Sequence, residues 1–69
     1  MTQRQRILQY IDDFGSITPM EAFTELGVTK LATRVSEMIR GGERISKTLE
    51  NGTNRYGERV SYMRYRRAE

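Results

Sequence analysis

The chain has 69 residues, a formal net charge of +3, and neither cysteine nor histidine. A chain this short forms one domain, and the missing residue types remove disulfides, thiolate metal sites and the commonest catalytic base. We therefore expect a single domain over residues 1–69 that is stabilised by packing and helix caps, with no cofactor and no metal. No signal-peptide pattern or long apolar run occurs, so we expect a soluble, cytoplasmic protein.

The charge is distributed unevenly along the chain. Residues 1–26 hold two basic and four acidic residues, a net charge of −2, whereas residues 27–69 hold ten basic and five acidic residues, a net charge of +5. A basic surface on one side of a fold suits nucleic acid, but an ordinary solvated face has the same composition. Charge alone does not decide between these readings.

A supporting helix is predicted over residues 3–14. Thr2 and Gln5 have the spacing of a capping box, and Gly15 can adopt the left-handed conformation that ends a helix. The apolar residues between them recur at helical spacing: Ile7, Leu8, Ile11 and Phe14. We expect this face to close the core over the helices that follow.

A second helix is predicted over residues 19–26. Thr18 and Glu21 form a T-x-x-E capping box, and Pro19 fits the first helical position. Gly27 is expected to end the helix. Three apolar side chains share one face and are expected to be in the core: Ala22, Phe23 and Leu26.

The third helix, residues 30–40, follows a tight turn in which Val28 is apolar and Thr29 is the expected cap. Its expected core stripe is Leu31, Val35, Met38 and Ile39. The stripe leaves outside a ridge at i, i+3, i+4 and i+7: Lys30, Thr33, Arg34 and Glu37. Such side chains can reach phosphates and base edges, so the two helices and their turn predict a DNA-binding helix-turn-helix.

The ridge residues have individual predicted contacts. Arg34 fits a bidentate contact with guanine, and Thr33 fits a phosphate or a thymine methyl group. Glu37 can accept a hydrogen bond from cytosine or orient Arg34. The alternative is an ordinary polar helix face, in which Glu37 pairs with Arg34 or Lys30 across one turn.

A two-stranded β-hairpin is predicted over residues 44–66. Residues 45–50 alternate in polarity, and residues 60–66 are rich in β-favouring side chains. Ile17 is expected to point inward from a brief strand beside this hairpin. A hairpin after three helices is the order of a winged helix.

The turn of the hairpin has two candidate positions. Asn51-Gly52 is the stronger isolated turn signal, but a turn there leaves the second strand without a partner. We therefore expect the loop at residues 54–57, with a bulge or bend at residues 51–52. That loop predicts two cross-strand pairs, Leu49 with Tyr62 and Lys47 with Arg64.

The expected hairpin tip carries two arginines and a tyrosine. Arg55 and Arg59 suit phosphates or a minor groove. Tyr56 is either a contact residue or an aromatic cover for the turn.

Catalysis is not expected, because Asp12 and Asp13 are adjacent and point in different directions on a helix, so they cannot share a site.

Three sequence blocks together resemble a family of small helix-turn-helix domains found in bacteriophages and prophages. They are Ser16-Ile17-Thr18-Pro19-x-Glu21-Ala22, then Leu26-Gly27 with Leu31-Ala32-x-Arg34-Val35-Ser36, and Thr53-Asn54-Arg55-Tyr56-Gly57-Glu58-Arg59-Val60. The resemblance covers residues 5–66. It implies an α+β winged helix-turn-helix with three helices, a short strand and a C-terminal two-stranded β-hairpin wing, acting on DNA in a bacterial host cell.

We therefore predict a phage-type protein that binds double-stranded DNA, either sequence-specifically or as an architectural protein. Its role would be that of a transcriptional or recombination accessory factor. The predicted contact residues are Lys30, Thr33, Arg34, Glu37, Arg55, Tyr56 and Arg59. The alternative is a winged-helix protein-interaction module, such as a phage inhibitor of a host polymerase, recombinase or CRISPR effector. A homodimer or a protein partner would add specificity, and neither a membrane nor a small-molecule substrate is expected.

Overall fold

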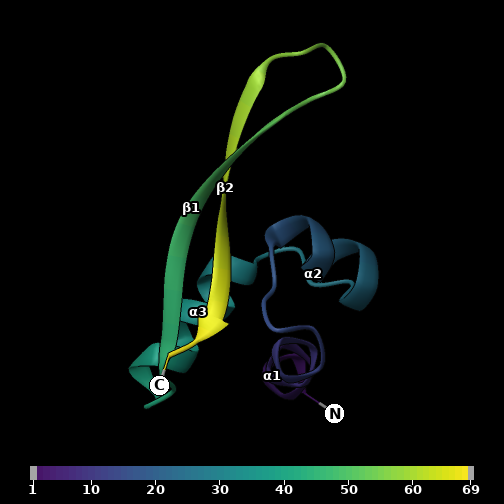
Figure 1. The fold of residues 1–69 in the computed structure, drawn as a ribbon. Helices are drawn as coiled ribbons and strands as arrows, with labels where there is room; N and C mark the ends of the chain where they lie inside the picture. The colour runs from purple at the N-terminus through teal and green to yellow at the C-terminus, as the bar shows by residue number, and fades with distance from the viewer. Residues whose placement is uncertain (1, 69) are drawn as a thin grey trace.

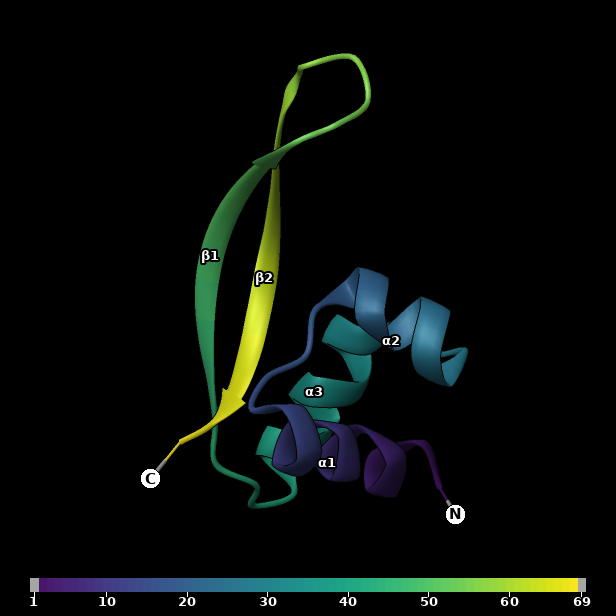
Figure 2. The same ribbon diagram turned by 45° about the vertical axis from the view of Figure 1, so that its right-hand side comes forward.

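The computed structural model describes residues 2–68, so the predicted domain ends at residues 1 and 69 lie outside the described residues. Its elements, in chain order, are α1 (Gln3–Phe14), α2 (Pro19–Leu26), α3 (Leu31–Arg40), β1 (Ile45–Thr53) and β2 (Arg59–Arg67). The helices pack together beside the base of a long hairpin, whose tip projects beyond them (Figure 1 and Figure 2). The molecule is therefore elongated, at 38 × 23 × 21 Å. The predicted α+β class is confirmed.

The first two helices have the caps that their sequences predict. Both capping boxes are complete, with Thr2 and Thr18 each accepting from the backbone N–H three residues on. Gly15 and Gly27 follow the helices with φ of 89° and 69°, a left-handed conformation that favours glycine. These ends are local features, so the sequence alone determines them.

The start of α3 differs from the prediction. Lys30 occupies the N-cap position and makes no side-chain cap hydrogen bond, so the predicted cap at Thr29 is wrong. Val28 is buried in the bend, and its N–H donates to the Ala22 carbonyl oxygen at 2.9 Å. The Arg34 N–H donates to the Lys30 carbonyl oxygen at 3.1 Å as the first bond of α3, so Lys30 is the N-cap residue and the helix begins at Leu31 rather than at residue 30.

The core lies between the three helices and the base of β2. Its buried residues are Ile7, Ile11, Ile17, Ala22, Val28, Leu31, Val35, Met38 and Tyr65. The prediction of core positions for Phe14, Phe23 and Ile39 is wrong, since they are 70%, 58% and 37% exposed. The small side chain of Ala22 takes the buried position on α2, and the Phe14 ring packs on Tyr10 with centroids 4.6 Å apart.

The hairpin turns near the predicted place but in a different register. The Asn54 N–H donates to the Glu58 carbonyl oxygen, so the loop covers residues 54–58 and is one residue longer than predicted. The extra residue shifts every pair by one. The observed pairs include Leu49 with Met63, Lys47 with Tyr65, Asn51 with Ser61 and Gly52 with Val60. The predicted pairs of Leu49 with Tyr62 and of Lys47 with Arg64 are wrong, and so is the predicted bulge at residues 51–52.

Ile17 attaches the free edge of β2 to the helices. Its N–H donates to the Tyr65 carbonyl oxygen and its carbonyl oxygen accepts from the Tyr65 N–H, both at 2.9 Å. The Ile17 side chain is fully buried. The predicted inward-pointing short strand is therefore confirmed as an isolated antiparallel bridge.

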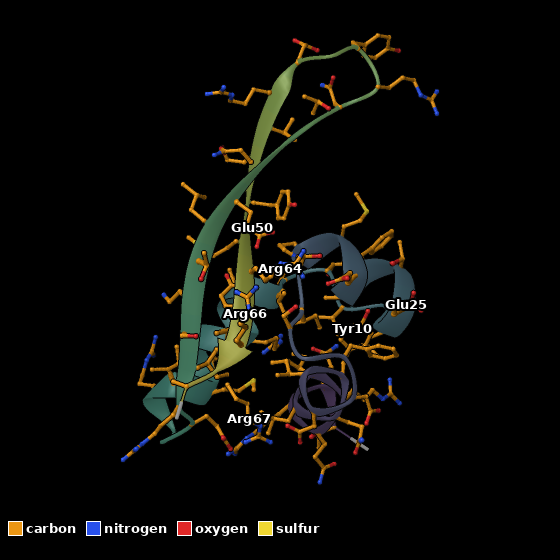
Figure 3. The ribbon with its side chains drawn as sticks, viewed as in Figure 1. Tyr10, Glu25, Glu50, Arg64, Arg66 and Arg67 are labelled. Carbon is orange, nitrogen blue, oxygen red and sulfur yellow. The ribbon has the colours of Figure 1, made fainter. Side chains whose placement is uncertain are left out.

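Arg64 joins the hairpin to the start of α2. Its Nε donates to Glu50 Oε1 at 2.9 Å, and its Nη1 donates to Ser16 Oγ at 2.8 Å (Figure 3). Glu21 Oε1, in the α2 capping box, lies 3.8 Å from the same Nη1. The hydrogen bond from Arg64 lowers the pKa of Glu50, so this pair is ionised at neutral pH. Arg64 thus links the hairpin to the start of α2, in addition to the bridge between Ile17 and Tyr65.

Candidate nucleic-acid interface

The exposed face of α3 is polar. Leu31, Val35 and Met38 are buried, and at 3.6 residues per turn they leave the opposite face to solvent. That face carries Thr33, Ser36, Glu37 and Arg40. Thr33 and Glu37 are predicted contact residues, and the same face carries Ser36 and Arg40, which are not among them. The position of these two residues opposite the buried stripe follows from helical periodicity.

Arg34 lies at the flank of this face and is only half exposed. Its Nη1 donates to Glu37 Oε1 at 2.6 Å, three residues along the helix. The pair borders a shallow recess of about 330 Å³ that also includes Gln3, Arg4 and Met38. Helix α1 thus brings a further arginine, Arg4, beside the predicted ridge, although Arg4 itself pairs with Glu43. No local pattern in the sequence indicates this long-range contact.

The hairpin tip presents all three predicted residues to solvent. The Asn54 Oδ1 atom accepts from the backbone N–H groups of Tyr56 and Glu58, at 2.9 and 3.0 Å, which orders the turn. The Tyr56 side chain is 81% exposed. Arg55 and Arg59 are also exposed, so their guanidinium groups are open to a ligand.

A comparison with family models identifies this arrangement. The model described as "Winged helix-turn-helix domain" matches residues 2–67. The chain belongs to this family. Membership of the winged helix-turn-helix family indicates DNA binding in general terms. In this chain, the hairpin of β1 and β2 is the wing. Neither the curated proteins nor the solved structures compared with this chain gave a match.

The predicted contact residues of this winged helix fall into two separate groups. Arg34 and Glu37 contact each other on α3, beside Thr33 and after Lys30. The turn that carries Arg55 stands away from all three helices in both views (Figure 1 and Figure 2). The structure therefore does not join the two groups into one continuous patch.

Ion pairs determine where positive charge remains free on the winged helix. The C-terminal arginines have acidic partners: Arg64 donates to Glu50, Arg66 lies 3.8 Å from the same carboxylate, and the Arg67 guanidinium donates to both Asp12 carboxylate oxygens at 2.8 and 3.1 Å. Among residues 2–68, the cations without an ion pair are Arg6, Lys30, Arg40, Arg44, Lys47, Arg55 and Arg59. Free positive charge therefore concentrates at both ends of α3, at the base of β1 and at the wing tip.

Residues 2–68 contain no group of three or more acidic side chains placed to hold a metal ion. Within the same residues, no helix has both the length and the apolar character needed to cross a membrane.

Proposed function

We propose that this winged helix binds double-stranded DNA through the exposed face of α3 and the wing tip, as a phage-type transcriptional or recombination accessory factor. One observation supports this most strongly. The face of α3 opposite the core presents hydroxyl and cationic side chains, and its single carboxylate, Glu37, is already paired with Arg34. Because that pairing offsets the negative charge, the helix can approach the DNA backbone.

Helix α3 would enter the major groove, which is wide enough to admit an α-helix. Lys30 and Arg40, at its two ends, would contact phosphates, while the hydroxyl groups of Thr33 and Ser36 lie between them. Arg34, oriented by its pair with Glu37, would bind guanine, or the same pair would hold Glu37 toward a cytosine amino group.

The wing tip would bind DNA next to that groove. Arg55 and Arg59 would contact phosphates or the narrow minor groove, and the exposed ring of Tyr56 would pack on a sugar. The separation of the tip from α3 suits two neighbouring contacts along the duplex rather than one. Whether the protein binds DNA sequence-specifically or as an architectural protein would then depend on how much of the affinity comes from α3.

Fluorescence anisotropy with a random-sequence duplex over a range of salt concentrations tests this proposal. We expect micromolar or tighter binding at low salt that weakens steeply as salt rises. Arg40→Ala should weaken binding about tenfold, whereas Arg6→Ala, which removes an equally unpaired cation from α1, should change it less than about twofold. Absence of binding at low salt, or equal effects of the two variants, would refute the proposal.

A specific observation also favours the alternative of a protein-interaction module. A groove of about 610 Å³ lies between the start of α2 and the outer half of the wing, lined by residues that include Pro19, Met20, Val60 and Tyr62. Met20, on its rim, is 70% exposed. Loss of DNA binding, combined with binding to a purified host polymerase, recombinase or CRISPR effector that Met20→Ser abolishes, would favour this second function.

A further inference from the structure

Strand β1 has one edge that nothing covers among residues 2–68. It pairs with β2 along its whole length, and β2 is the strand that packs against α1 and α2. The free edge of β2 receives Ile17. The outer edge of β1 faces away from α1 and α2 in both ribbon views (Figure 1 and Figure 2).

The hydrogen-bond pattern identifies which backbone groups point out of this edge. Tyr65 exchanges both its backbone bonds with Ile17, so its N–H and C=O point away from β1. Its partner Lys47 therefore stands in a non-hydrogen-bonded pair, and the Lys47 groups point outward as well. By alternation the same holds for Ile45, Leu49, Asn51 and Thr53. These five residues form an outer row of backbone donors and acceptors that β2 does not pair.

This edge lacks most features that prevent a strand from pairing with another chain. β1 is nine residues long, and its ladder with β2 runs without a bulge. It contains no proline, and Lys47 is the only charged residue in the outward-pointing row. Leu49, at the centre, is 60% exposed. A two-stranded sheet is only marginally stable alone, so its outer half gains from further strands.

We infer that β1 pairs antiparallel with β1 of a second copy of this chain, about a two-fold axis at Leu49. The product is a four-stranded sheet with an isologous interface. Leu49 of one copy lies opposite Leu49 of the other, Lys47 lies opposite Asn51, and Ile45 lies opposite Thr53. The two leucines are buried against each other, and no residues of like charge lie opposite each other across the interface.

Charge and burial select this register over its neighbours. An axis at Lys47 places two lysines opposite each other, and an axis at Glu50 places two glutamates opposite each other, which is destabilising. An axis at Thr48 sets each Leu49 opposite a Lys47, and an axis at Asn51 sets each Leu49 opposite a Thr53. Only the axis at Leu49 joins the two exposed leucines. This dimer would form in the absence of DNA, so it does not depend on DNA binding.

Sedimentation equilibrium of the full chain without DNA tests the dimer. We expect concentration-dependent dimerisation that Leu49→Lys weakens at least about tenfold, since two lysines then meet at the axis. Phe23→Lys is the matched control, because Phe23 is 58% exposed but lies on α2, and it should leave the dimer unchanged. Circular dichroism verifies that both variants are folded. A monomer at every concentration, or a dimer abolished by Phe23→Lys and not by Leu49→Lys, would overturn the inference.

Disulfide trapping tests the register, because the chain has no cysteine of its own. Paired residues at the axis have Cα atoms about 5.5 Å apart, within the range that a disulfide bridges. Leu49→Cys should therefore cross-link to itself under mild oxidation. Lys47→Cys alone should not, whereas a mixture of Lys47→Cys and Asn51→Cys chains should form the mixed dimer. Cross-linking of Leu49→Cys no faster than that of Phe23→Cys would contradict the proposed axis.

Discussion

Arg34 Nη1 lies 2.6 Å from Glu37 Oε1, so the candidate guanine-binding arginine is held by the only carboxylate of its own helix. We expect Glu37→Gln to release Arg34 and to remove a negative charge from the face that approaches DNA. Affinity for a random duplex should rise about threefold to tenfold at low salt, as measured by anisotropy. A fall in affinity would instead mean that the Glu37 carboxylate itself contacts DNA.

Arg55 and Arg59 make no ion pair among residues 2–68, and both are exposed at the wing tip. Each phosphate contact contributes about 0.9 to the slope of log affinity against log salt. We therefore expect Arg55→Ala and Arg59→Ala each to flatten that slope by about 0.9, without changing the melting temperature. An unchanged slope in both variants would show that the wing does not contact DNA phosphates. Arg6→Ala serves as the charge-matched control.

Arg64 and Arg66 offer a matched pair for testing how the hairpin is held. Arg64 hydrogen-bonds Glu50 and Ser16, whereas Arg66 only approaches Glu50, with 3.8 Å between Nη2 and Oε2. Arg64→Met should lower the melting temperature by several degrees, because it leaves Glu50 and Ser16 without their donor. Arg66→Met should have little effect. Similar melting temperatures for the two variants would show that Arg64 does not hold the hairpin.

The Arg64–Glu50 pair also predicts a pH dependence of stability. The hydrogen bond from Arg64 lowers the pKa of Glu50 in the folded state, so the pair stabilises the fold above the unfolded-state pKa of about 4.3. This contribution is lost as pH falls through the folded-state pKa. We expect Glu50→Gln to be less stable than the parent chain at neutral pH, with the gap closing in acid. Urea unfolding at several pH values measures it, and a gap independent of pH would argue against the pair.

Ile17 is fully buried and bridges to Tyr65, so its truncation tests the core. Replacing a buried isoleucine by alanine costs about 2–5 kcal/mol. A domain of this size has a free energy of unfolding of only about 3–5 kcal/mol, so the Ile17→Ala variant should be largely unfolded at room temperature. Phe14→Ala, at a 70% exposed site, should stay within about 0.5 kcal/mol of the parent chain. Equal stabilities by circular dichroism would contradict this description of the core.

The features that the sequence predicts correctly are local ones. The capping boxes at Thr2 and Thr18 and the glycine stops at Gly15 and Gly27 depend on residues within one helical turn. The order of helices and hairpin follows from these signals. The register of the hairpin does not, because one additional residue in the loop of residues 54–58 shifts every cross-strand pair.

The features that the sequence does not predict depend on distant contacts. Arg67 pairs with Asp12, and Arg64 donates to the Ser16 hydroxyl, across 55 and 48 residues of chain, so no local pattern predicts how these basic side chains are held. Phe23 and Ala22 are adjacent on α2, and only packing against the other elements decides which one is buried. The predicted ridge on α3 lies slightly to one side of the most exposed face, because it includes the half-exposed Arg34 at the flank and leaves out Arg40, which lies opposite the core.

Chemical-shift mapping by ¹⁵N NMR, with a short random duplex titrated into the labelled protein, tests the DNA-binding surface most directly. DNA binding through α3 and the wing predicts that the largest shifts fall on two segments, residues 30–40 and residues 54–59. The α2 backbone around Met20 and Phe23 should shift little. Shifts confined to α2 and its groove, or no shifts at low salt, would contradict DNA binding by this surface.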